Sequence, residues 1–339
     1  MTDRMGIALV GIGPGAVPHL RSLHDLRGSI ELRHAVTRRP ERADMGPFTG
    51  QLDASSDLQA ALADPLVQGV IVATPPATHL ELARQCFALG KHLLLEKPLD
   101  ISTQRAQAIV DLAGAAKLRL GVVLQFRFTP GAVALKAALA SGRLGAVQAA
   151  SVRVPWWRPQ AYYDQAGRGT RARDGGGVLL TQAIHSIDLF RSLVGVRSVQ
   201  AAQVRRTGLH QMETEDFASA LLTLGNGAPG QLMATTAMYP GFAERIEIIG
   251  ALGSAVLEGG ALHIQYLDGE ALQVASEGGT GSGANIMDFP HDAHRAVLGD
   301  FVQAIRQGRD PVVTGEDALA TQRLIDQVLH CAAPAAPSH

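Results

Sequence analysis

Polar residues near the middle of the chain have the spacing of a reactive face on a helix. Residues 178–193 are expected to form that helix, and Thr181, His185 and Asp188 follow one another at i, i+4 and i+7, on one side of it. An imidazole titrates near neutral pH and therefore suits the removal of a proton from a hydroxyl group. The spacing fits a histidine that faces a cleft, and equally a structural histidine hydrogen-bonded to Asp188.

A lysine follows a short buried strand that is expected at residues 91–95. Lys97 stands just beyond its carboxyl end, the end at which open α/β sheets bind their ligands. An ammonium group in that place can donate a hydrogen bond to an oxygen that gains negative charge, or relay a proton. Lys97 and His185 together predict chemistry at a hydroxyl-bearing carbon.

The chain begins with the order strand, glycine turn and helix. Residues 6–16 read GIALVGIGPGA. In a dinucleotide-binding unit Gly11 allows the sharp exit from the strand, Gly13 lets backbone N–H groups approach a pyrophosphate, and Ala16 lets helix and strand pack closely. The helix N-terminus adds free N–H donors and partial positive charge. The pattern predicts a nucleotide site, and an ordinary strand–turn–helix is the alternative.

The end of the second expected strand, residues 30–36, bears on which dinucleotide is bound. Thr37 and Arg38 follow it, where an NAD-binding fold usually presents an acidic side chain to the ribose 2′-hydroxyl. An arginine binds a 2′-phosphate through charge-assisted hydrogen bonds, whereas a carboxylate repels it. We therefore expect NADP as the cofactor, with NAD possible. The alternative is that the arginine is simply a solvated side chain at the end of the strand and contacts no cofactor.

Strands and helices alternate through the first part of the chain. The apolar runs at residues 67–74 and 118–128 are typical of strands buried in a parallel sheet. Thr78, in the segment TPPATH, is expected to cap the helix that follows the first of them. This alternation predicts a Rossmann domain with a doubly wound parallel sheet over residues 1–126.

Short strands separated by glycine-rich turns dominate later, and they predict an antiparallel sheet in an α+β domain over residues 127–339. Two helices, at residues 289–307 and 316–329, are expected to close the chain. A flexible loop is expected at residues 278–283, and a frayed end at 332–339.

Aromatic residues cluster at residues 156–163 (WWRPQAYY), which hold both tryptophans and two of the four tyrosines. In a chain with only 4% aromatic residues, this predicts stacking on a sugar or ring, or a subunit contact.

Composition excludes several classes of function. The 339 residues carry a net charge of −1 and show no basic stripe with interleaved aromatics, so neither nucleic acid nor an anionic membrane is an expected partner. The two cysteines, Cys86 and Cys331, supply no disulfide framework. No long apolar span or signal peptide is evident, and the chain is expected in the cytoplasm. His291 and His294 lack further ligands at fixed spacing, so they predict a solvated helix start and no metal site.

Five segments, taken together, resemble the GFO/IDH/MocA (glucose–fructose oxidoreductase / inositol dehydrogenase) family of NAD(P)-dependent oxidoreductases. They are GIGPGA, VATPPATH, EKP, GGGVLLTQAIHSID and DFVQAIRQGRDPVVTGEDALAT, and they cover nearly the whole chain in order. The resemblance implies a C-terminal domain with an open, mostly antiparallel sheet, through which homodimers or homotetramers form. The segments around WWRPQAYYD and TQAIH look most similar to branches acting on sugars or sugar acids, notably the UDP-N-acetylglucosaminuronate 3-dehydrogenases.

The resemblance also implies roles for individual residues. Lys97 falls on the family's catalytic lysine and His185 on its catalytic histidine, while Thr181 stands where most members have an aspartate. A threonine is no carboxylate base, and the similar sugar-acid branch lacks the aspartate too. Cofactor contacts are expected from Gly11, Gly13, Pro14, Gly15, Ala16, Thr37, Arg38, Thr74, Pro75, His79, Glu96 and Lys97. Substrate contacts are expected from Arg127, Arg158, Tyr163, Gln182 and His185.

The expected reaction is hydride transfer between NAD(P) and a secondary alcohol or hemiacetal of a sugar, sugar acid or related cyclic polyol. Two alternatives stay open: a redox-neutral, NAD-dependent glycoside hydrolase, and a non-catalytic NAD(P)-sensing regulator. The hydrolase would retain its cofactor through each cycle, whereas a dehydrogenase exchanges it. Retention of Lys97 and His185 argues against the regulator, and Thr181 keeps it open.

Overall fold

The computed structural model describes residues 4–276, 281–283 and 289–332. The chain divides into two compact units: Met1–Gln125 with His291–Leu319, and Phe126–Pro290 with Ala320–His339. The sequence predicts a single boundary, after residue 126. In the structure the segment 291–319 returns to pack with the first unit. The expected loop at 278–283 and the expected tail at 332–339 lie largely outside the described residues.

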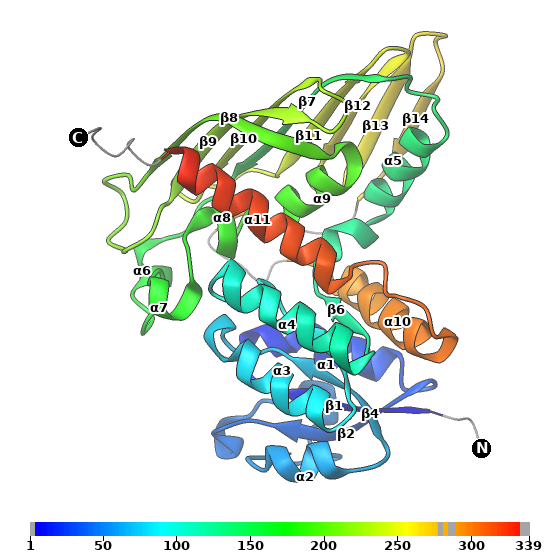
Figure 1. Cartoon of the computed structure of the whole chain (residues 1–339), viewed down its shortest axis with the longest axis vertical. Coiled ribbons are helices and arrows are strands. Elements are labelled where there is room, and N and C mark those ends of the chain that lie inside the picture. The colour runs from blue at the N-terminus through cyan, green and yellow to red at the C-terminus, as the bar shows by residue number, and fades with distance from the viewer. Residues whose placement is uncertain (1–3, 277–280, 284–288, 333–339) are drawn as a thin grey trace. The chain divides into compact units, whose positions relative to one another are not determined.

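The first unit holds a six-stranded parallel sheet in the order β3-β2-β1-β4-β5-β6 (Figure 1). Its strands are β1 Met5–Val10, β2 Ile30–Val36, β3 Ala54–Ser55, β4 Val67–Val72, β5 His92–Leu95 and β6 Leu120–Val122. Its helices include α1 Val17–Asp25, α2 Leu58–Ala63, α3 His79–Ala88, α4 Thr103–Ala116 and α10 Asp292–Gln307. The strand order reverses between β1 and β4, which is where doubly wound sheets bind ligands. The expected doubly wound sheet is confirmed.

One expected strand is much shorter than predicted. The run at residues 118–128 contributes only β6 to the sheet, and Gln125–Phe128 forms a 3-10 turn. The ladder ends because Leu124 N–H already donates to the carbonyl of Val122, 2.9 Å away, which turns the backbone out of the sheet.

The second unit holds an eight-stranded sheet in the order β14-β13-β12-β11-β7-β10-β9-β8. Its strands are β7 Val147–Pro155, β8 Val196–Arg205, β9 Phe217–Leu224, β10 Pro229–Thr235, β11 Arg245–Gly250, β12 Gly253–Glu258, β13 Ala261–Tyr266 and β14 Ala271–Val274. Neighbouring strands are antiparallel except for the parallel pair β7–β10. The mostly antiparallel sheet is therefore confirmed. Helices α5 Pro130–Ala140 and α9 Ile184–Val194 lie on one of its faces (Figure 1).

The helix expected at residues 178–193 is interrupted. Helix α8 Val178–Thr181 ends at Gln182, and α9 begins at Ile184. At the break, the N–H of Ala183 reaches back five residues to the carbonyl of Val178, at 2.8 Å. The prediction that Thr181 and His185 share the face of one continuous helix is wrong.

The chain closes with α10 and with α11 Gly315–Ala332, close to the expected positions. In the part of the chain that the structure describes, no helix has the length and apolar character to span a membrane.

Candidate active site

The glycine turn after β1 has the shape that a dinucleotide requires. Gly11 has φ +97°, and a Cβ on it would lie 2.7 Å from the Thr74 side chain. Gly13 and Gly15 are different, because a Cβ on either would meet no atom within 4 Å. Their lack of a side chain leaves open space beside the backbone, as close approach of a pyrophosphate demands. Ala16, fully buried, packs the following turn against the sheet.

Lys97 lies two residues past the end of β5, on a turn that the half-buried acid Glu96 fixes. Glu96 accepts the N–H of Lys97 at 3.2 Å, and its other oxygen lies 2.7 Å from Nε2 of His19 on α1. Burial is the largest single influence and works against ionisation of Glu96, but the hydrogen bond from His19 and the charges of nearby groups together outweigh it, and the pKa of Glu96 is lowered. The His19–Glu96 contact therefore positions the backbone that carries Lys97.

His294 on α10 completes this buried cluster. Its ring packs edge-on against His19, with centroids 5.7 Å apart, and it is only 5% exposed. Burial lowers the pKa of His294 to about 3, so the ring is uncharged. The expectation of a solvated helix start is wrong for His294. No group of three metal-ligating side chains occurs among the described residues.

His79 ties two loops of the same sheet edge together. Its ring is fully buried, with Nε2 3.0 Å from the carbonyl of Thr74 and Nδ1 3.0 Å from that of Leu99. Any effect of His79 on a cofactor would therefore pass through the positions of these loops. The expected side-chain cap from Thr78 is absent from α3, because its hydroxyl donates to the carbonyl of Pro75 instead.

The end of β2 exposes the side chains that were expected to select the cofactor. Thr37 is held by its N–H, which donates to the carbonyl of Ser55 at 2.8 Å. Arg38 is exposed and has no ion pair with any described residue. Its guanidinium is thus available to an anion.

The segment that carries Thr181 and His185 is anchored by an acid that the sequence did not indicate. Glu215 accepts the N–H groups of Gly177 and Leu179, at 3.0 and 3.2 Å, and so caps α8. Burial raises the pKa of Glu215. The hydroxyl of Thr181 donates back to the carbonyl of Gly177 at 2.7 Å, which commits its proton to the helix.

His185 lies in the first turn of α9 and is 7% exposed. Its ring packs against Phe126, with centroids 5.1 Å apart. Asp188 serves a different residue: it binds the guanidinium of Arg127 through both oxygens, at 2.6 and 2.7 Å, and accepts the hydroxyl of Thr321. Both oxygens of Asp188 thus have partners other than the imidazole. Arg127, which was expected to contact the substrate, is bound to Asp188 in the structure.

The remaining expected substrate residues form a buried network. Gln182, at the helix break, accepts from Nε of Arg158 at 3.1 Å and donates to the hydroxyl of Tyr162 at 2.8 Å. Tyr163 is hydrogen-bonded to Thr236 at 2.7 Å, and burial raises its pKa. The aromatic residues Trp156, Tyr162 and Tyr163 are all below 9% exposed. These three are packed as core and form no exposed aromatic surface, whereas Trp157 is half-buried; stacking or a subunit contact stays a prediction.

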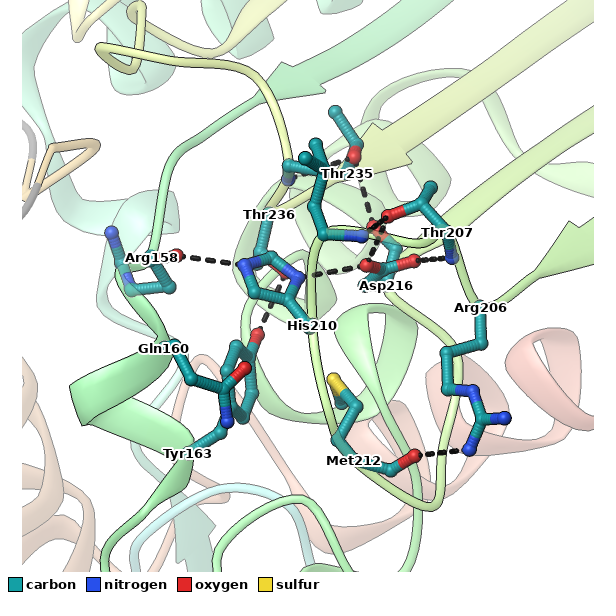
Figure 2. Close-up of polar contacts among 12 residues, drawn as sticks. Arg158, Gln160, Tyr163, Arg206, Thr207, His210, Met212, Asp216, Thr235 and Thr236 are labelled. Atoms are coloured by element: carbon teal, nitrogen blue, oxygen red, sulfur yellow. Dashed lines mark hydrogen bonds and ion pairs between the residues drawn. The ribbon is translucent and has the colours of Figure 1, made fainter.

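A buried ion pair that sequence reasoning missed supports this network (Figure 2). Nδ1 of His210 lies 2.7 Å from Asp216, and Nε2 lies 2.8 Å from the carbonyl of Arg158. Both partners only accept hydrogen bonds, so both ring nitrogens must carry protons. Burial lowers the pKa of His210, but the bonds to Asp216 and the carbonyl outweigh it, and the pKa is raised. The imidazolium fixes the backbone of Arg158.

Glu244, the residue before β11, leads to a prediction about the pH dependence of stability. It is buried and accepts the indole N–H of Trp156 at 3.3 Å, and burial raises its pKa to about 7 from 4.5. The folded chain keeps this proton where the unfolded chain loses it, so the stability it contributes is full below pH 4.5 and is lost as pH rises through about 7. The loss amounts to about 3 kcal/mol. Glu244→Gln should abolish this loss, as measured by urea unfolding followed by tryptophan fluorescence.

The matched control for that experiment is Glu247→Gln. Glu247 lies on β11, is partly exposed and forms an ion pair with Arg245, and its pKa is lowered, the opposite direction to that of Glu244. The control should keep the wild-type decline in stability between pH 4.5 and about 7. An equal decline in the Glu244→Gln chain would contradict the assignment.

Comparisons with known proteins agree with this architecture. A family model described as "Oxidoreductase family, NAD-binding Rossmann fold" matches residues 5–124, and one described as "GFO/IDH/MocA C-terminal domain" matches residues 132–256. Inositol 2-dehydrogenase of Rhizobium meliloti is 26% identical over 79% of this chain and 79% of its own length. Inositol 2-dehydrogenase 2 of Saccharopolyspora erythraea is 28% identical over 97% and 93%.

Among solved structures, the WlbA dehydrogenase from Bordetella pertussis, in complex with NADH and UDP-GlcNAcA, is 26% identical over 97% of this chain and 96% of that chain, with a TM-score of 0.81. The two family models together cover more than half of the 339 residues. The chain belongs to the GFO/IDH/MocA family and is an NAD-binding oxidoreductase.

Proposed function

We propose that the chain transfers a hydride between nicotinamide and a secondary alcohol or hemiacetal carbon of a sugar, sugar acid or related polyol. The observation that carries this is one sheet edge in the first unit. There the open glycine turn follows β1 and the Lys97 turn follows β5, both at the carboxyl edge of the parallel sheet and on either side of the point where the strand order reverses. That edge is where a dinucleotide and a reacting group meet in this fold.

The chain's own residues supply the proton chemistry. His185 removes the hydroxyl proton, because an imidazole is the side chain whose ordinary pKa matches neutral pH. Lys97 donates a hydrogen bond to the oxygen as negative charge develops on it. When bound, the nicotinamide ring supplies the hydride acceptor or donor. Thr181, whose hydroxyl is bonded to Gly177, shapes the site and takes no proton.

The experiment that tests this function is a panel of sugars, sugar acids, inositols and dihydrodiols offered with NAD⁺ and NADP⁺. The expected result is reduction of the nicotinamide, seen by its absorbance, with at least one class of alcohol. The named relatives above are dehydrogenases, and they give no support to the redox-neutral hydrolase or the regulator.

We infer that NADP is the preferred cofactor, because the exposed Arg38 replaces the usual acid beside the ribose. Arg38→Ala should lower kcat/KM for NADP⁺ by about 10- to 100-fold, since a charge-assisted hydrogen bond contributes about 1.5–3 kcal/mol. The value for NAD⁺ should change little. Arg42→Ala is the control, because Arg42 is exposed nearby and already faces Glu41. A wild-type preference for NAD⁺ would refute the inference.

A further inference from the structure

Arg158 is a buried cation with neutral partners. It is 2% exposed; its Nε donates to Gln182, and its Nη1 donates to the carbonyls of Trp157 and Gly283, at 2.8 and 2.7 Å. No carboxylate of the described residues forms an ion pair with it. A charge taken out of water normally requires an opposite charge beside it. Within residues 4–276, 281–283 and 289–332 no acid balances this guanidinium, and an anionic ligand would supply the missing charge.

A second arginine, Arg168, which forms no ion pair with any described residue, contacts the same tyrosine ring as Arg158. The guanidinium carbon of Arg168 lies 4.5 Å from the centroid of the Tyr162 ring, and that of Arg158 lies 6.0 Å from the same centroid. Nε of Arg168 is buried and has no hydrogen-bond partner among the described residues. Burial, and then repulsion from Arg168, lower the pKa of Arg158, although the nearby tyrosines oppose this.

Neighbouring arginines on the same stretch are compensated. Arg171 lies 3.7 Å from Glu213, and Arg173 lies 3.7 Å from Asp174. The excess positive charge is thus confined to the pair that flanks Tyr162. In the part of the chain that the structure describes, the other two arginines thus face acids, whereas Arg158 and Arg168 do not.

The pair rests on a rigid support. Gln182 holds both Nε of Arg158 and the hydroxyl of Tyr162, and the carbonyl of Arg158 is bonded to the His210–Asp216 ion pair (Figure 2). A preorganised guanidinium loses little entropy when it binds. Gln182 stands three residues before His185, so the same helix break carries the proposed base.

We propose that Arg158 and Arg168 bind an anionic group of the substrate, a carboxylate or a phosphate. The planar fork of a guanidinium matches the oxygens of both groups. This inference rests on the proposed function in one respect, namely that the anion belongs to the alcohol that is oxidised. It narrows the substrate class from sugars and polyols in general to acidic ones.

The test compares matched substrates: glucose with glucuronate, and glucose with glucose 6-phosphate. Wild-type kcat/KM should be higher for one of the acidic compounds than for glucose, and the arm that responds identifies carboxylate or phosphate. Arg168→Gln should lower kcat/KM for that compound about 10- to 100-fold, mainly through KM, because the contact is made before and during reaction. The same variant should change kcat/KM for glucose by no more than about twofold. Arg171→Gln is the control and should match wild type.

Equilibrium binding of glucuronate and glucose 6-phosphate, by calorimetry, separates this proposal from the proposed function. If no sugar reduces the nicotinamide but an acidic sugar binds the wild type and not Arg168→Gln, the anion site stands and the function is wrong. If glucose and both acids are used equally well, or Arg168→Gln weakens glucose as much as the acids, the anion site is wrong. Arg158→Lys, checked for folding by its melting temperature, should retain binding only weakly, because it keeps the charge and loses the fork.

Discussion

Replacement of His185 by alanine should lower kcat by about 10²- to 10⁴-fold, the usual contribution of a general base. The imidazole lies buried on α9, and both oxygens of the nearby Asp188 are bound by Arg127, so the Arg127–Asp188 ion pair does not depend on the imidazole. Cofactor affinity, measured by quenching of tryptophan fluorescence, should change by no more than a few-fold. The loss should therefore appear in turnover and in its pH profile.

Lys97→Ala should lower turnover to a similar extent, because the substrate oxygen loses the hydrogen bond that stabilises its charge.

The control for His185→Ala is His263→Ala, since His263 is an exposed residue on β13 in the same unit as His185. A His185→Ala enzyme with wild-type kcat would remove the imidazole from the mechanism.

Gly177→Ala should be among the most disruptive single changes in the second unit. A Cβ at Gly177 would lie 1.9 Å from the carbonyl oxygen of Glu215 and 2.6 Å from its carboxylate. Both groups are fixed, because the carboxylate caps α8 and the Glu215 carbonyl accepts the N–H of Val178 at 2.8 Å. Relief of the clash must shift the segment leading to His185. We expect a loss of about 2–4 kcal/mol in the free energy of unfolding, and loss of turnover.

Chemical denaturation and activity measured on the same preparation check this prediction. Gly208→Ala is the control, because a Cβ there would meet no atom within 4 Å. Wild-type stability together with wild-type turnover in Gly177→Ala would show that α8 can move without consequence, contrary to the role given to the cap.

The fold was largely predictable because its signals are local. Apolar runs separated by glycine and proline turns specify a parallel sheet in one half and an antiparallel sheet in the other, and no distant partner is needed to see them. The prediction of one helix over residues 178–193 was wrong because the signal that breaks it is not local. Its break at Gln182 accompanies hydrogen bonds to Arg158 and Tyr162, partners about 20 residues away that apolar periodicity does not encode.

The candidate site divides in the same way. The place of Lys97 follows from the end of a strand, and the open space at Gly13 follows from the turn pattern. The supports could not be foreseen, because His19 lies 77 residues from Glu96 and Glu215 lies 38 residues from Gly177. His294 looked solvated for a related reason: its neighbour His19 comes from the other end of the chain.

The most direct test of the central claim is the fate of the hydrogen on the reacting carbon. A substrate found in the panel is prepared with deuterium at that carbon and incubated with the wild-type chain and oxidised cofactor, and both products are analysed by mass spectrometry. We predict that the deuterium is found on the reduced nicotinamide and that the sugar is recovered as the ketone or lactone. Recovery of the deuterium in a cleaved sugar, with the cofactor oxidised and still bound, would contradict the account.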